Sequence, residues 1–156
     1  MAADLDAGTP FQARLAPSGD LVAVLVPTTS SSTAVISRIL LVSVASSQVQ
    51  TTLQTKGSIL QIDFPTNSKC VALCKTTNDK YRLVAWDLDR GVVDWEEDAP
   101  VDTNWTHMAC LENSIFVLAK SSNSSKVQVH EYKNNKLARK IKAGKLLARG
   151  LGVTKQ

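Results

Sequence analysis

Aromatic residues, histidines and long apolar runs are scarce in this 156-residue chain. Aromatics make up 5% of it, so Val, Leu, Ile and Ala must fill the core that an apolar fraction of 44% can supply. No apolar run approaches the roughly 20 residues that span a bilayer. Residues 1–6 lack the basic and apolar regions of a signal peptide. These absences predict one domain in a nuclear or cytoplasmic protein that is not secreted.

The chain also has little that could form a catalytic or metal site. Its two histidines, His107 and His130, are far apart and have no ligand-spaced neighbours. Cys70 and Cys74 fall on one face of a predicted strand but about 13 Å apart, so they are interpreted as small core residues rather than as a disulfide or zinc pair. With neither a Gly-x-Ser-x-Gly turn nor a phosphate-binding loop, the sequence predicts no enzyme, no cofactor and no metal site.

What the chain does contain is an internal repeat. Three segments share one plan, in which an apolar strand, a polar turn and a second strand follow in order. Their corresponding positions Val42, Ala85 and Val129 are 43 and 44 residues apart. Turn residues such as Pro and Gly also divide the segment upstream of each into a hairpin. Each repeat therefore predicts four antiparallel strands, which is the make-up of one propeller blade.

Residues 78–93 carry the pattern of a known repeat. Asp79 stands in a tight turn before a strand that ends in Trp86-Asp87, and a short turn with Gly91 leads to an outer strand. This stretch resembles the second half of a WD repeat, whose period is about 40–45 residues. Residues 16–23 resemble the first hairpin of the same family. One Trp-Asp pair is present and no Gly-His dipeptide precedes a blade, so the resemblance is to degenerate WD repeats.

The predicted fold class is all-β, with antiparallel four-stranded blades of a WD40-like β-propeller in an incomplete ring of about three blades. Blade 1 is expected at about 11–54, blade 2 at about 58–97 and blade 3 at about 106–142, with a basic tail or the start of a further blade at 143–156. Because propellers have about four to eight blades, the chain is a fragment or completes a ring with another chain. In blade 3, Gln128, His130 and Tyr132 share a polar strand face, which fits an open end.

Positive charge gathers at the end of the sequence. Residues 133–156 hold eight basic side chains and no acidic one, whereas residues 1–132 hold ten basic and fourteen acidic side chains. We expect an outer strand over 136–142, with a basic helix over 135–150 as the alternative. Such a run can contact phosphates, or it can be a solvated edge that discourages strand pairing. The candidate phosphate or RNA contacts are Lys136, Arg139, Lys140, Lys142, Lys145 and Arg149.

An acidic cluster follows the outer strand of the second blade. Paired carboxylates run acid–base chemistry only in a desolvated cleft, so a solvated edge is the simpler interpretation and a docking patch for a basic partner is the alternative. Two tryptophans stand beside the cluster, and aromatics are frequent anchors of protein interfaces. The candidate protein-docking residues are therefore Trp95, Glu96, Glu97, Asp98 and Trp105.

Three functions compete on this sequence. The first and favoured one is a non-catalytic protein–protein interaction scaffold, whose partners are other subunits of a multiprotein complex. The second is an RNA-associated subunit of a nuclear or nucleolar ribosome-biogenesis complex, since the chain is similar in style to WD-type subunits that assemble the small ribosomal subunit. The third is a quinoprotein-like propeller enzyme, suggested by one short stretch at 90–95 that resembles a repeat of that class. None of the three predicts contact with a membrane.

Overall fold

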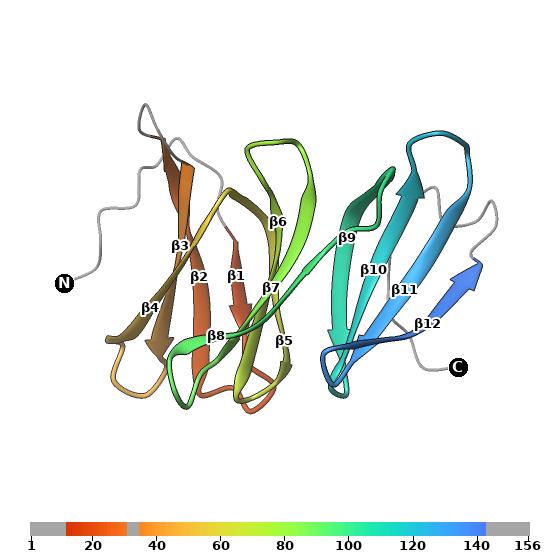
Figure 1. The fold of residues 1–156 in the computed structure, drawn as a ribbon. Coiled ribbons are helices and arrows are strands. Elements are labelled where there is room, and N and C mark those ends of the chain that lie inside the picture. Colours follow the sequence, from red (N-terminus) through yellow and green to blue (C-terminus); the bar gives the residue numbers. More distant parts are fainter. Residues whose placement is uncertain (1–11, 31–34, 143–156) are drawn as a thin grey trace.

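Three antiparallel sheets stack face to face in the protein (Figure 1). The structure is a computed structural model and describes residues 12–30 and 35–142. Blade 1 consists of β1 (Ala13–Leu15), β2 (Leu21–Ser30), β3 (Val35–Ser43) and β4 (Val49–Lys56). Blade 2 consists of β5 (Ser58–Thr66), β6 (Lys69–Lys75), β7 (Tyr81–Asp87) and β8 (Val92–Asp98). Blade 3 consists of β9 (Thr103–Leu111), β10 (Ser114–Ser121), β11 (Val127–Lys133) and β12 (Lys136–Lys142).

Each sheet is a meander in which strands pair in sequence order. The order within a blade, from first strand to fourth, is the arrangement of a propeller blade. The prediction of an all-β fold with antiparallel four-stranded blades in an incomplete ring is confirmed. The predicted outer strand over 136–142 is confirmed too, since β12 has these bounds.

The first strands of the blades lie together along one side of the stack. β5 contacts both β1 and β9. Side chains of β5 also bind the backbone of β9: Gln61 accepts a hydrogen bond from the N–H of Met108, and Asp63 accepts one from the N–H of Cys110 at 2.9 Å. Blades 2 and 3 are therefore joined by hydrogen bonds as well as by their shared core.

Blade 2 is buried on both faces, which explains its continuous apolar runs. Along β6, Cys70, Ala72 and Cys74 pack against blade 1, whereas Val71 and Leu73 pack against blade 3. Burial raises the pKa of both Cys70 and Cys74 to about 12, so their thiols are neutral core groups. The interpretation of this pair as small core residues is confirmed.

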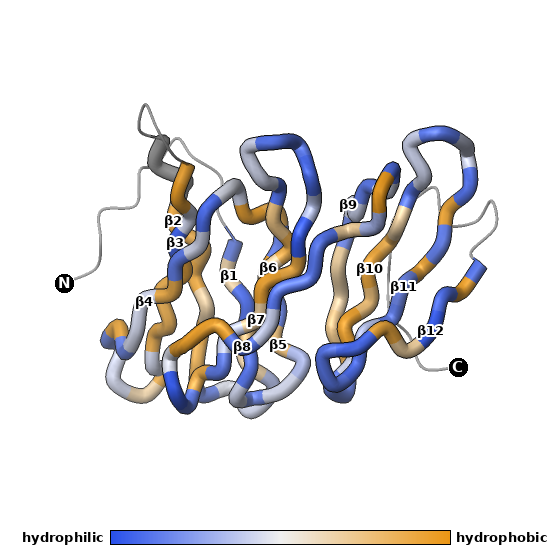
Figure 2. The backbone as a smooth tube through the Cα atoms, in the orientation of Figure 1, coloured by the Kyte–Doolittle hydropathy of each residue, from blue (hydrophilic) through white to orange (hydrophobic). Residues whose placement is uncertain are grey.

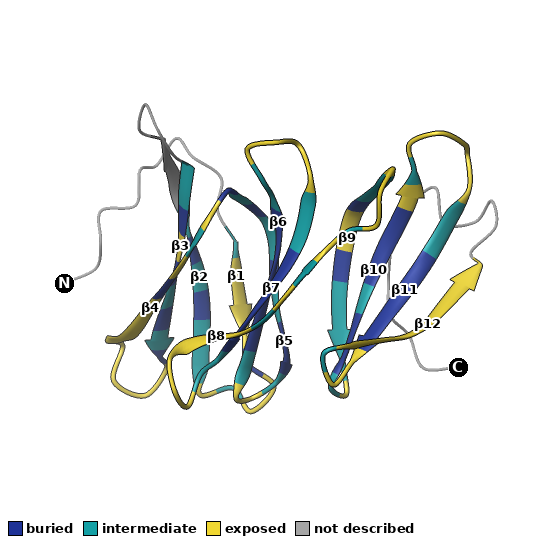
Figure 3. Cartoon of the chain, in the orientation of Figure 1, coloured by how far each residue is buried: buried dark blue, intermediate teal, exposed yellow. Residues whose placement is uncertain are grey.

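Among the long strands, the fourth strand of each blade is the most exposed. In Figure 3, β4, β8 and β12 are largely exposed, while buried residues concentrate on the second and third strands. Figure 2 shows the matching hydropathy, with apolar segments along β2, β3 and β10 and a mainly polar β12. β8 and β12 are strongly charged, and charged exposed strands resist pairing with other chains, so this distribution suits the outer rim of a propeller.

Two hairpins of blade 3 turn through pairs of residues at positive φ. Glu112 and Asn113, between β9 and β10, have φ of 50° and 67°. Asn134 and Asn135, between β11 and β12, have φ of 53° and 63°. Two successive residues in this region form a type I′ turn, whose twist matches that of the flanking strands. Asparagine tolerates this conformation better than most residues, which explains the Asn-Asn pair.

The passage from blade 1 to blade 2 depends on Gly57. Its φ is +100°, and an added Cβ would lie 2.7 Å from the carbonyl oxygen of Lys75. The buried hydroxyl of Ser37 donates to the Gly57 carbonyl at 2.8 Å and accepts from the N–H of Ile59 at 3.2 Å. One glycine and one buried serine therefore hold the start of β5 against blade 1.

Candidate functional site

The face of blade 1 that points away from blade 2 is apolar and half-exposed. Along β2, Ala23 and Leu25 pack into the core shared with blade 2, so the alternate residues Val22 and Val24 face the other way. They pair with Val42 and Leu40 of β3, respectively. All four are only partly buried. The neighbouring Leu15 of β1, paired with Val22, is 58% exposed.

The strands that form this face have the continuous apolar sequence of strands that are buried on both faces. β2 and β3 share their continuous apolar pattern with β6, which is buried on both faces. In β6 the neighbouring blades cover both sets of alternate residues. In β2 and β3 the described part of the chain covers one set. The sequence could not distinguish the two situations, because an apolar run looks the same whether or not its second neighbour is present.

The opposite end of the stack, the outward face of blade 3, is mixed. Leu118 and Val129 are paired at its centre and are buried, while Phe116 and Val127 beside them stay partly exposed. The expectation that Gln128, His130 and Tyr132 form a polar open face is wrong. Register places these side chains with Val117 and Ala119, on the side that packs against blade 2.

The basic strand β12 lies on the outer rim of blade 3 and is exposed along its whole length. Of its predicted phosphate contacts, Arg139 is engaged, because its Nε donates to Glu131 at 2.5 Å. Burial disfavours ionisation of Glu131, but hydrogen bonds from Ser114 and Arg139 outweigh it and lower its pKa. Within the described residues, Lys136, Lys140 and Lys142 have no ion-pair partner.

Two of the predicted contacts cannot be placed. Lys145 and Arg149 lie outside the described residues, as does the proposed start of a further blade. The described part of the basic segment therefore offers three lysines on one strand edge.

The tryptophans predicted as docking anchors belong to the interface between blades 2 and 3. Trp105 is fully buried there, so its assignment as a surface anchor is wrong. Its ring meets the edge of Tyr132 with centroids 5.8 Å apart. Trp95 is partly buried and tilts against the same Tyr132 at 5.4 Å. Burial, and secondarily the charge of Glu97, raises the pKa of Tyr132 to about 12.

The acidic residues beside Trp95 are divided between the two faces of β8. Arg82 donates to Asp98 at 2.5 Å, and this hydrogen bond raises the pKa of the guanidinium. Glu96 pairs with Val84 on the same face as Asp98, whereas Glu97 and Trp95 face blade 3. The structure therefore does not gather the predicted docking residues into one patch.

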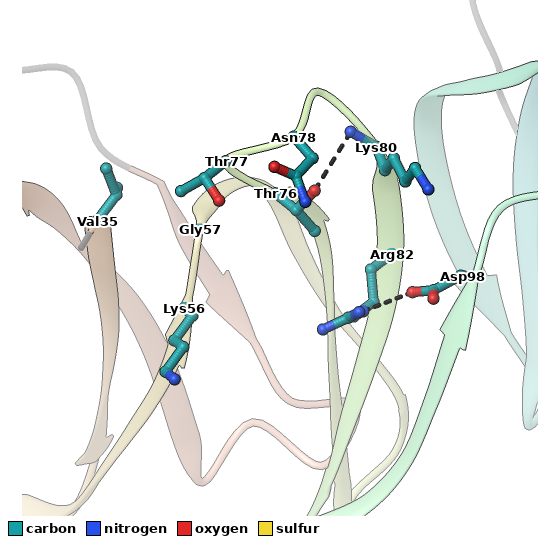
Figure 4. A pocket seen from close by; sticks show the side chains of 9 residues that line it. All are labelled: Val35, Lys56, Gly57, Thr76, Thr77, Asn78, Lys80, Arg82 and Asp98. Atoms are coloured by element: carbon teal, nitrogen blue, oxygen red, sulfur yellow. Dashed lines mark hydrogen bonds and ion pairs between the residues drawn. The ribbon is translucent and has the colours of Figure 1, made fainter. Parts of the chain in front are cut away.

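A polar pocket of about 480 Å³ opens between blades 1 and 2 (Figure 4). Lys56, Lys80 and the Arg82–Asp98 pair contribute charge to its lining, and the hydroxyls come from Thr76 and Thr77. Thr76 Oγ1 accepts the N–H of Lys80 at 3.3 Å. The volume of this pocket lies within the usual range for small-ligand pockets. The positive charge of its lining, however, is spread along an open rim.

A second pocket of about 310 Å³ lies between the β8–β9 connection and the sheet of blade 3. Its lining combines lysines, hydroxyl groups and a histidine, namely Pro100, Thr103, Ala119, Ser121, Ser124, Lys126, Gln128, His130 and Lys140. His130 is 3% exposed, and burial, followed by the charge of Lys140, lowers its pKa. No local sequence pattern connects His130 with Lys126 and Lys140, because sheet register and the β10–β11 loop bring these residues together.

No group of three or more His, Cys, Asp or Glu side chains in the described ranges is placed to hold a metal ion. These ranges likewise contain no helix that could cross a membrane.

Comparison with known proteins places the fold. No family model and no curated protein matches the sequence. Among solved structures, the β-propeller domain of the Trilobed protease from Pyrococcus furiosus, described as having an open velcro topology, is similar with a TM-score of 0.56 and 12% identity. The match covers 83% of this chain and 42% of that one. At this identity the likeness shows the fold alone, which is that of a β-propeller, and this chain spans less than half of the compared structure.

Proposed function

We propose that this chain is a non-catalytic interaction scaffold in a larger assembly, and that its open blade 1 face receives a sheet from a partner. The observation that carries the proposal is the partly exposed apolar face formed by Val22, Val24, Leu40 and Val42. Contiguous exposed apolar patches usually mark interaction sites. Completing the burial of each of these side chains contributes about 0.5–1 kcal/mol, taking roughly a third of the value for full burial.

The partner chemistry follows from the interfaces within the stack. Blade 2 covers the other face of blade 1 with an apolar sheet that includes Ile62, Cys70 and Trp86. A partner for the open face would present a comparable apolar sheet face, either from another protein or from further blades of a longer propeller. Because propellers need about four or more blades to close, three blades leave room for such a partner.

Matched aspartate substitutions test the scaffold. Leu15 and Val101 are both large, exposed apolar residues, at 58% and 90% exposure, but Leu15 belongs to the open face and Val101 to the β8–β9 connection. In quantitative affinity purification, Leu15→Asp should remove a stoichiometric partner that Val101→Asp retains. Circular dichroism of both variants establishes that they are folded. Equal partner recovery with Leu15→Asp and with Val101→Asp would sink the proposal.

The repeats themselves are proposed to be degenerate WD repeats. The local chemistry of Trp86-Asp87 supports this assignment. Trp86 is buried in the core shared with blade 1. Asp87 caps the β7–β8 turn, because its carboxylate accepts hydrogen bonds from the N–H groups of Asp89 and Arg90 and from the Arg90 side chain. The hydrogen bond from the Arg90 side chain is the main cause of the lowered pKa of Asp87.

A second candidate function is RNA association within a nuclear or nucleolar ribosome-biogenesis complex. The observation that favours it is the exposed β12 edge with Lys136, Lys140 and Lys142 free of ion pairs in the described structure. Replacing all three by glutamine should reduce the salt dependence of RNA binding by a log–log slope of about 2, since each phosphate contact on a single strand contributes about 0.7. An unchanged slope would show that these three lysines do not contact RNA phosphates, and would contradict the proposed role of β12.

A further inference from the structure

Neighbouring blades are joined by a hydrogen bond that recurs at the same position of the repeat. In blade 1, Gln12 lies opposite Leu25, whose N–H donates to the Gln12 carbonyl, and the Gln12 side chain donates to a backbone carbonyl of β5. In blade 2, Gln61 is paired with Leu73, and its side chain accepts a backbone N–H of β9. A polar side chain opposite a leucine therefore binds the first strand of the following blade.

His107 occupies this position in blade 3. It is paired with Leu118, as Gln61 is paired with Leu73, and it lies on the face that points away from blade 2. His107 is exposed, and its Nδ1 is 3.1 Å from the hydroxyl oxygen of Thr106. The described residues place no further blade beyond it. Its second ring nitrogen can bind a backbone group of a following strand, as the two glutamines do.

Apolar side chains surround His107 on the outward face of blade 3. Register places Phe116, Val127 and Ile141 on this face beside Leu118 and Val129. Phe116 and Val127 are partly exposed, and Ile141 is 37% exposed. In blade 2, the corresponding face of β6 and β7 packs against the following blade. The blade 3 face is therefore equivalent to a face that receives another blade.

Glu131 is the carboxylate that covering this face would desolvate. It is already 7% exposed, and it accepts hydrogen bonds from Ser114 and Arg139. Burying an unpaired charge is strongly destabilising, whereas this carboxylate keeps its partners. The blade 3 face can therefore be covered without leaving Glu131 unpaired.

The open face of blade 1 is of the opposite kind. Val22, the second residue of β2, is paired with Val42. The same position in blade 2 is Cys70, the second residue of β6, which is paired with Trp86 and packs with it against the preceding blade. Within the described residues, the stack therefore ends in one face that lacks a preceding blade and one that lacks a following blade.

We propose that these two faces bind each other between two copies of this chain, so that blade 3 of each copy packs on blade 1 of the other. This inference rests on the proposed function, since it names the partner of the blade 1 face. A second copy supplies both missing neighbours at once, each with the kind of face that already packs within the chain. Two copies related by half a turn bring together six blades, which lies within the range of about four to eight for closed propellers.

Sedimentation velocity of the full chain over a range of micromolar concentrations tests the pair. The expected particle has twice the 16.9 kDa mass of one chain. Dilution below the Kd of the pair separates the two copies, so the isolated chain then exposes both end faces.

Aspartate substitutions on the two faces test the arrangement. Leu15→Asp alters the blade 1 face and Ile141→Asp alters the blade 3 face, and both side chains are exposed in the single chain. Loss of one apolar contact should weaken each interface about tenfold. The pair contains every substitution twice, so its Kd should rise by about 100-fold in either variant. Val101→Asp, on the exposed β8–β9 connection, should leave the Kd within about twofold of the parent.

A second variant of the blade 3 face replaces a more central side chain. Phe116→Ala removes a partly exposed ring without adding charge, and circular dichroism establishes that the variant is folded. Its Kd should rise at least as much as that of Ile141→Asp, because an aromatic side chain buries more area.

Variants of His107 test whether it takes the part of the two glutamines. His107→Ala removes one hydrogen bond from each interface, so the Kd of the pair should rise by at least about tenfold. His107→Gln restores the residue found at positions 12 and 61 and should pair about as well as the parent chain. Equal pairing of the alanine and glutamine variants would contradict the repeated hydrogen bond.

Three outcomes overturn the pair of chains. The first is a single chain at every concentration, which would leave the end faces to other occupants such as residues 143–156 or a different protein. The second is a pair that Ile141→Asp and Phe116→Ala leave unchanged, which would show that the blade 1 faces bind each other. The third is a mass that grows beyond two chains, which would show that the contact does not close into a ring.

Failure of this inference and failure of the scaffold proposal are distinguishable. If the chain is monomeric but Leu15→Asp still removes a different protein in affinity purification, the pair is wrong and the scaffold stands. If Leu15→Asp affects neither the mass nor the recovery of any partner, both are wrong.

Discussion

Replacing Gly57 by alanine should lower the free energy of unfolding by about 2–4 kcal/mol. A φ of +100° is a backbone conformation that residues with a side chain rarely adopt, and holding such a residue there costs about 1–3 kcal/mol. The added Cβ would also lie 2.7 Å from the Lys75 carbonyl oxygen. Because Lys75 is paired with Ser58, the clash is relieved only by shifting backbone, for about 1 kcal/mol more.

Guanidinium denaturation followed by tryptophan fluorescence measures this loss. Gly91→Ala is the matched control, since Gly91 has a φ of +69° but no atom within 4 Å of an added Cβ. The control should lose only the cost of the left-handed conformation, about 1 kcal/mol. Gly57→Ala should therefore lose at least about 1 kcal/mol more than Gly91→Ala. Equal losses would refute the tight crossing between blades 1 and 2.

Three further predictions concern the core and the pH dependence of stability. Leu73→Asp should abolish folding by circular dichroism, because Leu73 is completely buried and an unpaired buried charge costs several kcal/mol; a folded variant would contradict the blade assignment. The thiols of Cys70 and Cys74, with a pKa of about 12, should react with iodoacetamide only as fast as the chain unfolds, and immediate labelling in mass spectra would contradict their burial. The lowered pKa of His130 means that the unfolded chain binds the proton more tightly, so stability should fall as the pH drops below about 6.5. His130→Gln should flatten this part of the pH profile of the melting temperature and His107→Gln should not; equal profiles would refute the assignment.

The repeat architecture was predictable because each blade carries its own local pattern. Apolar runs and turn residues recur at a constant period, and the strand tendency of Leu21–Ser30 or Lys69–Lys75 does not depend on distant parts of the chain. The core role of Cys70 and Cys74 followed from their spacing on a strand. These features are encoded within a few residues, which is the range that sequence patterns cover.

The candidate sites were less predictable because they depend on contacts between neighbouring blades. Trp105 stands beside an acidic cluster in the sequence, but the stacking of blade 3 on blade 2 buries it. His130 has an ordinary sequence context, and its pocket exists because β12 and the β10–β11 loop bring Lys140 and Lys126 to it. Residues far apart in the sequence meet in these interfaces, as Asp63 and Cys110 do at a separation of 47 positions. No local pattern reports such contacts.

The blade 1 face shows that a local pattern also does not reveal whether a neighbouring element covers an apolar strand. Val22 and Val24 belong to an apolar run like that of a fully buried strand, yet they remain partly exposed in the described structure. The sequence encodes a face fit for burial without indicating what buries it. This mismatch between pattern and exposure is the basis of the scaffold proposal.

Hydroxyl-radical footprinting of the isolated chain and of the same chain in its native assembly tests that proposal most directly. Leu15 and Leu40 report on the blade 1 face, and Val101, which is 90% exposed, reports on a surface outside it. The scaffold account predicts that oxidation of Leu15 and Leu40 falls several-fold in the assembly while that of Val101 is unchanged. Equal oxidation of Leu15 and Leu40 in the two samples would show that nothing covers this face and would contradict the account.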